Sequence, residues 1–443
     1  MKKTFSRNTS RRDFVKGTGL MAGGILAAPL LSRANFFSGA DDTIKIAVVG
    51  CGGRGTGAAM QALSSKQNVK IVAMADAFKD NLDNCHKSLT DEINNSIGEL
   101  AKRLDVPEER RFTGFDGYQK AIALADVVIL ATPPGFRPIH FAEAIKQGKH
   151  VFMEKPVATD PAGIQSVLAT AAIAKEKKLN VVVGLQRHYQ NSYRELYKRK
   201  DMIGDITSAQ AWWDNDGVWV RPRKYNQTEM EYQMRNWYYF NWLCGDHITE
   251  QHIHNLDVIN WFKGGHPIKA QGFGGRQVRK GKDHGEIFDH HFVEFEYADG
   301  SILNSQCRHI PGTMSKVDEL LIGTKGKIFC GAAHIKDHSG KIIYQYDTKL
   351  ENNPYQSEHD ELFAAIAKGE YKFADAENGA SSTMTSIMGR MATYSGQIIE
   401  WDKAINSGID IHPKKYDWNA EPPVMPNADG YYPIAIPGVT KYF

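Results

Sequence analysis

The most constraining feature of the sequence is a glycine-rich turn placed between a strand and a helix. The apolar run 43–49 leads directly into residues 50–55, which read GCGGRG, and a helix-forming stretch follows. Glycines at this G-x-G-x-x-G spacing allow a tight turn and a close backbone approach, and the helix N-terminus favours an anion. The pattern predicts the pyrophosphate-binding turn of a dinucleotide site. The residues expected to form it are Gly50, Gly52, Gly53, Arg54 and Gly55.

A carboxylate follows this turn at the spacing typical of a dinucleotide site. The second apolar run, residues 69–75, ends at Asp76, which lies 21 residues after Gly55. An acid at the end of this strand can accept hydrogen bonds from the adenosine ribose hydroxyls, and it repels a 2′-phosphate. We therefore expect the cofactor to be NAD and not NADP.

Two further apolar runs end in short triplets that interrupt the strand pattern. One run leads into the triplet TPP at 132–134, and the other leads into the triplet EKP at 154–156. In an open parallel sheet, ligands bind at the carboxyl ends of the strands. The residues of these triplets that are expected to contact the cofactor are Thr132, Pro133, Glu154 and Lys155.

Residues 1–34 have the three parts of an export signal. Basic residues precede the uncharged stretch 17–31, and small residues flank Arg33 at the end of the segment. The pair Arg11-Arg12 resembles a twin-arginine (Tat) signal, whose substrates cross the membrane already folded and often with a cofactor inside. We expect export of the folded protein to the periplasm, and the sequence leaves cleavage after Ala34 open. The uncharged stretch is shorter than the about 20 apolar residues that a membrane span needs.

The basic balance of the whole chain comes from this N-terminal segment. The formal net charge is +3, from 54 basic and 51 acidic side chains, and residues 1–34 contain seven of the basic ones and one acidic one. The rest of the chain is therefore slightly acidic, and it offers no basic surplus for binding nucleic acid. No other stretch is apolar enough to predict a membrane span. Five cysteines without C-x-x-C spacing indicate neither a zinc ribbon nor a disulfide framework.

Taken in order, these motifs resemble the Gfo/Idh/MocA family of oxidoreductases. The similarity also includes the strand 181–184 and a His-x-x-Asp helix at 254–257. The resemblance implies an α/β fold, with an NAD-binding Rossmann domain at 43–187 and an α+β substrate and oligomerisation domain at 188–443. The second domain is expected to have an open, mainly antiparallel sheet, a C-terminal helix that packs back across the domains, and an irregular tail. The family also implies a homo-oligomer, either a dimer or a tetramer.

The resemblance assigns catalytic roles as well. Lys155 matches the active-site lysine that positions the reacting hydroxyl, and His254 matches the histidine of the proton relay. Glu250 stands where the family has an aspartate, which makes its role less certain than that of His254. Oxidation of a secondary alcohol needs a proton acceptor beside the hydride acceptor, and a histidine with a pKa of about 6.5 suits that task. Glu250 or Asp257 is expected to orient the imidazole, because one helix would place them on the face of His254.

Polar residues near this helix leave a metal site as an alternative. The cluster consists of His247, Glu250, His252 and His254. Histidine and carboxylate together can ligate zinc or another divalent ion. However, His252 and His254 lie about 200° apart on a helix of about 3.6 residues per turn, so they cannot both face one ion unless the segment is extended. We therefore expect no metal.

Aromatic residues are concentrated between Trp212 and Trp242, where five of the eight tryptophans lie. Such rings stack against the C–H faces of sugars, and packing in the core or at a subunit interface is the alternative. The candidates for substrate contact are Arg187, His188 and Trp237.

The sequence leaves several functions open. The first is an NAD-dependent oxidoreductase that acts on a secondary hydroxyl of a small-molecule carbohydrate, namely a sugar, glycoside or cyclitol. Export to a compartment without a large dinucleotide pool would require this enzyme to hold NAD tightly. One alternative is an NAD-dependent glycosidase, which oxidises, eliminates and reduces without net redox change. The others are a closed two-substrate oxidoreductase and a non-catalytic NAD-containing binding protein.

Overall fold

A parallel sheet forms the first part of the fold. The computed structural model describes residues 43–95 and 99–442, and within these ranges six strands pair in the order β3-β2-β1-β4-β5-β6. Each strand runs parallel to its neighbours. The strands are β1 (Ile44–Val49), β2 (Val69–Asp76), β3 (Arg111–Thr113), β4 (Val127–Leu130), β5 (His150–Met153) and β6 (Val181–Val183). The predicted export signal lies outside the described residues.

The strands of this sheet are short apolar runs with helices between them. Every residue of β4 and β6 is buried, as expected for strands that are covered on both faces. The strand order reverses between β1 and β4, and such a reversal opens a crevice at the carboxyl ends of the strands. The predicted Rossmann arrangement is confirmed. Its helices are α1 (Gly53–Leu63), α2 (Lys79–Asn95), α3 (Gly117–Ala123), α4 (Arg137–Lys146) and α5 (Pro161–Glu176).

A larger, mainly antiparallel sheet forms the second part. In the described part of the chain it has nine strands in the order β14-β13-β12-β11-β7-β10-β9-β8-β15, and only β7 and β10 pair in parallel. Buried and half-buried residues alternate along β9 and β10, so one face packs against the core. The expected open sheet is confirmed. The strands are β7 (Ile206–Asn215), β8 (Lys269–Gly275), β9 (His290–Glu296), β10 (Ile302–His309), β11 (Lys316–Gly323), β12 (Gly326–Phe329), β13 (His334–Asp337), β14 (Ile342–Gln345) and β15 (Ile399–Glu400).

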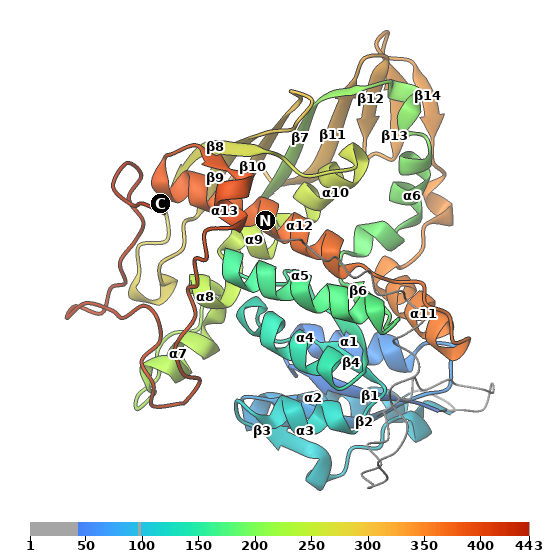
Figure 1. Ribbon diagram of the computed structural model, residues 1–443, viewed down its shortest axis with the longest axis vertical. Coiled ribbons are helices and arrows are strands. Elements are labelled where there is room, and N and C mark those ends of the chain that lie inside the picture. The colour runs from blue at the N-terminus through green and yellow to red at the C-terminus, as the bar shows by residue number, and fades with distance from the viewer. Residues whose placement is uncertain (1–42, 96–98, 443) are drawn as a thin grey trace, which may run out of the picture. The chain divides into compact units, whose positions relative to one another are not determined.

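The long helix α12 (Ala376–Ser395) lies between the two sheets (Figure 1). It contacts β8 and β9 of the larger sheet and also α5 and β6 of the Rossmann part. A Cβ on Gly389 would lie 2.9 Å from atoms of Ile248 and Phe295, so the absence of a side chain lets this helix pack closely. None of the described helices is long and apolar enough to cross a membrane. The other helices are α6 (Asn191–Lys198), α7 (Glu229–Arg235), α8 (Asn241–Cys244), α9 (His247–Glu250), α10 (Ile253–Lys263), α11 (Pro354–Ala367) and α13 (Trp401–Ile405).

The chain after α13 is an irregular arm. Figure 1 shows this arm, drawn in dark red, passing beside α7. Tyr432 of the arm packs edge-on against Phe240, with 4.9 Å between the ring centroids. The arm thus belongs to the same apolar cluster as the segment around α7 and α8.

Candidate active site

A cavity of about 530 Å³ opens at the carboxyl ends of the parallel strands. Its walls come from the segments after all six strands of the parallel sheet and, on the other side, from residues 213–238 and 250–254. The cavity therefore lies between the Rossmann part and the larger sheet. The predicted cofactor residues that line it are Gly50, Gly52, Gly53, Arg54, Asp76, Thr132, Pro133, Glu154 and Lys155.

The glycine turn has the shape that a dinucleotide requires. Gly50 has a φ of +96°, and a Cβ on it would lie 2.4 Å from the amide nitrogen of Thr132. A Cβ on Gly55 would lie 1.8 Å from the Gly50 carbonyl oxygen, so Gly55 packs α1 against the turn without lining the cavity. A Cβ on Gly52 or Gly53 would meet no atom within 4 Å. The backbone at the N-terminus of α1 thus borders open space, which fits the pyrophosphate of NAD.

Asp76 holds this turn in place from the end of β2. Its Oδ2 accepts a 2.7 Å hydrogen bond from the Cys51 amide, and its Oδ1 accepts one of 2.8 Å from the Phe78 amide. Burial raises the pKa of Asp76, and the two amide donors oppose the rise. A carboxylate on the wall of the cavity suits a ribose with free hydroxyls, as NAD carries.

Arg54 lines the cavity, but its charge is neutralised by carboxylates of the protein. The guanidinium forms ion pairs with Glu154 and, at 3.3 Å, with Glu358. It also donates a 2.9 Å hydrogen bond to Gln61. The Arg54 side chain therefore ties α1 to the end of β5 and to α11, and it is not free to pair with a phosphate.

A buried arginine that the sequence analysis did not single out fixes both predicted triplets. Arg137 is 1% exposed, and burial lowers its pKa to about 10. Its guanidinium donates to the Thr132 carbonyl oxygen at 2.6 Å and to the Glu154 carbonyl oxygen at 2.9 Å. Arg137, which also lines the cavity, thus holds the loops after β4 and β5 together.

Lys155 and Glu250 form an ion pair on the cavity wall. The Lys155 ammonium lies 3.1 Å from the Glu250 carboxylate and donates a 2.5 Å hydrogen bond to the Glu250 carbonyl oxygen. Burial raises the pKa of Glu250, and the nearby Lys155 opposes this rise. The pair joins the end of β5 to α9, so the two parts of the fold meet at the site where both residues were predicted to act.

His254 lies beside this pair and is held mainly by packing. Its ring stacks on Trp213 with 5.9 Å between the centroids, and its Nδ1 has no hydrogen-bond partner among the described residues. Burial lowers the pKa of His254 well below its ordinary value, and the cations of Lys155 and Arg187 act in the same direction. The imidazole is therefore neutral at neutral pH and can accept a proton or a hydrogen bond.

The predicted orientation of His254 by Asp257 is wrong. Asp257 does not line the cavity, and its carboxylate binds His188 at 2.8 Å and Ser382 at 2.8 Å. His254 and Asp257 share the helix α10, but the partners of Asp257 lie outside the cavity. Glu250 lies on the separate helix α9. Glu250 binds Lys155 and does not orient the imidazole.

Two of the three predicted substrate residues also lie away from the cavity. Arg187 is buried in an ion pair with Glu319. His188 pairs with Asp257 and packs on Trp261, with 4.2 Å between the ring centroids. Their side chains thus bind partners within the fold, and neither residue lines the cavity. The third candidate, Trp237, does line the cavity.

The four-residue cluster considered as a metal site is divided between two environments. Glu250 and His254 line the cavity. His252 points into the fold, where its Nε2 lies 2.7 Å from the Ser305 hydroxyl, and His247 is fully buried. These four side chains therefore do not converge on one ion.

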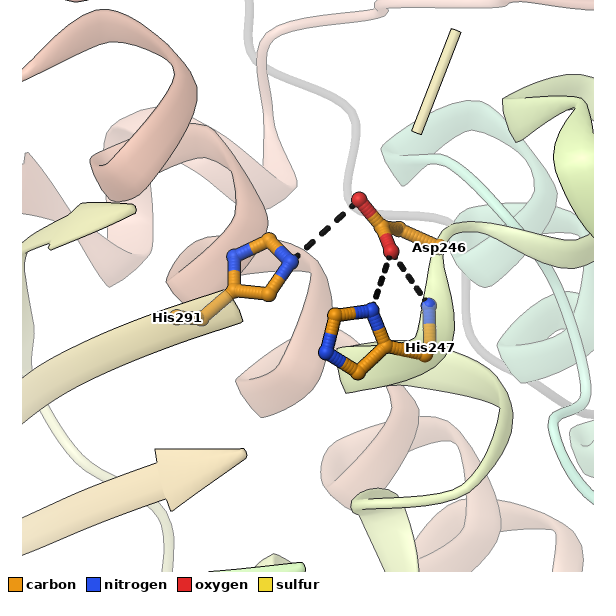
Figure 2. Close-up of side chains that lie close together, drawn as sticks. All are labelled: Asp246, His247 and His291. Atoms are coloured by element: carbon orange, nitrogen blue, oxygen red, sulfur yellow. Dashed lines mark hydrogen bonds and ion pairs between the residues drawn. The ribbon is translucent and has the colours of Figure 1, made fainter. Parts of the chain in front are cut away.

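His247 instead belongs to a buried group with Asp246 and His291. Figure 2 shows the Asp246 carboxylate between the two imidazoles, with its oxygens 2.7 Å from His247 Nδ1 and 3.3 Å from His291 Nε2. The carboxylate also accepts a 2.6 Å hydrogen bond from Tyr394. Burial alone would raise the pKa of Asp246, but His291 and His247 hold it well below its usual range. Because protein donors occupy its oxygens and Arg279 lies 3.5 Å from His247, this group fits a buried hydrogen-bond network better than a metal site.

The end of the cavity near Asp76 is covered by α7 and the C-terminal arm. The Arg235 guanidinium lies 3.7 Å from the Phe78 ring centroid and forms a 2.7 Å ion pair with Asp80. Trp418 of the arm packs on Phe78 and on Phe115, with 5.1 Å and 4.6 Å between the ring centroids. Phe78, Phe115 and Arg235 all line the cavity. We call these contacts of Arg235 and Trp418 the cover.

Comparison with known proteins agrees with this geometry. Residues 44–185 match the GFO_IDH_MocA model, which describes an oxidoreductase family with an NAD-binding Rossmann fold. An inositol 2-dehydrogenase of Gluconacetobacter diazotrophicus is 30% identical over 38% of this chain and 45% of that protein. Another, of Cereibacter sphaeroides, is 23% identical over 78% of this chain and 92% of that protein. With several curated relatives the chain aligns over less than half of their length, 43–45%.

Solved structures share the fold over most of the chain. A scyllo-inositol dehydrogenase from Lactobacillus casei with bound NAD(H) and scyllo-inositol aligns over 82% of this chain and 100% of that chain, with a TM-score of 0.60 and 21% identity. An aldose-aldose oxidoreductase from Caulobacter crescentus aligns over 81% and 100%, with a TM-score of 0.63 and 16% identity. Together with the glycine turn and Asp76, these findings show that residues 44–185 match the NAD-binding Rossmann fold of this oxidoreductase family.

Proposed function

We propose that this protein oxidises a secondary hydroxyl of a sugar, glycoside or cyclitol, and that NAD stays bound between turnovers. The observation that carries the proposal is the Lys155–Glu250 pair beside His254, in a cavity that continues to the glycine turn. The relatives named as inositol 2-dehydrogenases support a cyclic polyol as the substrate class.

Each of the residues Lys155, Glu250 and His254 has a separate role in this reaction. Bound NAD supplies the hydride acceptor. Lys155 donates a hydrogen bond to the reacting hydroxyl, and its charge stabilises the oxygen as the proton leaves. Glu250 accepts the hydroxyl proton, for which it is a stronger base than an exposed carboxylate because burial raises its pKa. The neutral His254 accepts a hydrogen bond from the substrate and fixes the orientation of the sugar ring.

The cover over the Asp76 end supports retention of the cofactor. Arg235 and Trp418 come from segments outside the Rossmann part, and both contact residues that line the cavity. A bound dinucleotide leaves only after these contacts open. Retention also agrees with the export that residues 1–34 predict, since an exported enzyme cannot draw on a large dinucleotide pool.

The decisive experiment measures the cofactor and the turnover separately. Purified protein is precipitated with acid, the released NAD(H) is quantified, and cyclitols and methyl glycosides are then assayed with and without an added hydride acceptor. We expect bound NAD, and acceptor-dependent turnover that Lys155→Ala abolishes and that the exposed-residue control Lys146→Ala keeps. Protein without NAD that is fully active on added NAD would refute retention. Release of the aglycone without an acceptor would instead indicate the NAD-dependent glycosidase.

A further inference from the structure

Two residues of the cavity wall carry buried polar atoms without a partner. Trp213 Nε1 and the Tyr238 hydroxyl have no hydrogen-bond partner among the described residues, and both side chains line the cavity. A buried donor without an acceptor is destabilising, so native structures leave few of them. When such atoms belong to a cavity wall, a ligand in the cavity can satisfy them.

Both residues flank the candidate catalytic groups. The Trp213 ring stacks on His254 at 5.9 Å. The Tyr238 ring lies 6.0 Å from His309, whose Nε2 is 2.8 Å from the side-chain oxygen of Gln251, the residue after Glu250. The two residues therefore lie at the end of the cavity where the substrate would react, and not at the covered end near Asp76.

The chemistry of the two atoms restricts what can satisfy them. An indole N–H is a donor only. The Tyr238 hydroxyl keeps its proton, because burial and the Glu250 carboxylate raise its pKa, so it can donate a hydrogen bond, and its oxygen can also accept one. When both atoms donate, they bind acceptor oxygens of the ligand beside the oxygen that Lys155 holds. The aromatic rings around them offer apolar surface to the C–H groups of a ring.

We propose that Trp213 and Tyr238 are substrate-binding residues that select a polyhydroxylated ring, by donating hydrogen bonds to two oxygens flanking the reacting hydroxyl. This inference rests on the proposed function and names its substrate class as a ring with three neighbouring oxygens. Each residue has a matched neighbour that does not line the cavity. The Tyr239 hydroxyl already donates to the Val218 carbonyl oxygen at 3.3 Å. Trp212 has the Lys316 ammonium 3.2 Å from its ring centroid.

The test uses the NAD-loaded protein and four variants, Tyr238→Phe, Trp213→Phe, Tyr239→Phe and Trp212→Phe. The probes are the cyclitol or methyl glycoside that the wild type oxidises fastest and its monodeoxy derivatives. We expect Tyr238→Phe and Trp213→Phe to lower kcat/KM by about tenfold each, with NAD content and pH profile unchanged. A monodeoxy substrate that lacks the hydroxyl bound by one of these residues should lower the kcat/KM of the wild type by about tenfold. The same substrate should change the kcat/KM of the corresponding variant little.

Three results would overturn this assignment. The first is a kcat/KM within twofold of wild type in both cavity variants. The second is an equal loss in Tyr239→Phe or Trp212→Phe, which would indicate a general packing effect. The third is a loss that follows NAD content, which would assign the two donors to the cofactor. If the wild type oxidises no polyol or glycoside at all, the proposed function fails together with this inference.

Discussion

Removal of the Trp418 side chain tests whether the cover holds the cofactor. Trp418 is half-buried and meets Phe78 and Phe115 with 5.1 Å and 4.6 Å between ring centroids. Aromatic pairs of this kind contribute about 0.5–1.5 kcal/mol each, so Trp418→Ala should favour the open state by about 1–3 kcal/mol. At about 1.4 kcal/mol per factor of ten, NAD should leave roughly 5- to 150-fold faster.

The assay measures the rate at which bound NAD exchanges with labelled NAD, together with the NAD content after desalting. Tyr431→Ala is a suitable control, because Tyr431 is 45% exposed on the same arm and does not line the cavity. Thermal melting must show that the Trp418 variant is folded. A folded Trp418→Ala protein that releases NAD at the rate of wild type would show that the arm does not retain the cofactor.

Further predictions concern the turn, the buried ion pairs and pH. Gly52→Ala should stay folded but lose NAD, because its Cβ would fill open space at the turn. Gly55→Ala should fail to fold, since its Cβ would lie 1.8 Å from a carbonyl oxygen. Thermal melting and measurement of bound NAD check both variants. Asp246→Ala leaves buried donors unpaired and should lower the free energy of unfolding by about 3–5 kcal/mol in urea titrations, and an unchanged midpoint would contradict this. Burial lowers the pKa of His140 and of His252 to about 3, so the unfolded chain binds protons first as pH falls. The free energy of unfolding should then fall below about pH 6.5 by about 1.4 kcal/mol per pH unit for each histidine, and a flat profile down to about pH 4.5 would contradict it.

The cofactor half of the site could be predicted because it is local in the sequence. The glycine turn, Asp76 and the two triplets each follow an apolar run directly, and parallel pairing brings all of these strand ends to one edge of the sheet. Glycine at positions 50 and 55 is required by close backbone contacts that any fold with this turn must make. Burial of Arg137 between these loops carries no comparable signal, since a lone arginine in a helix usually lies at the surface.

The substrate half could not be predicted to the same degree because its contacts come from distant parts of the chain. Asp257 lies three residues after His254 on α10, but its carboxylate binds Ser382 and His188 and does not line the cavity. Adjacent residues of a strand face opposite sides, so one of Trp212 and Trp213 had to face the Rossmann part. The sequence does not say which of the two does, since that depends on the neighbours of β7 in the sheet.

The difference between the cofactor half and the substrate half of the site limits what similarity to known enzymes can say about the substrate. The family model covers residues 44–185, which contain the glycine turn and Lys155 but neither Glu250 nor His254. Trp213 and Tyr238 also lie outside it. The relative that aligns over 78% of this chain is only 23% identical. NAD binding is therefore supported by both motif and fold, while the choice of sugar depends on side chains that no shared motif fixes. Variants of those side chains, and not of the glycine turn, are the ones that can distinguish a cyclitol from a glycoside.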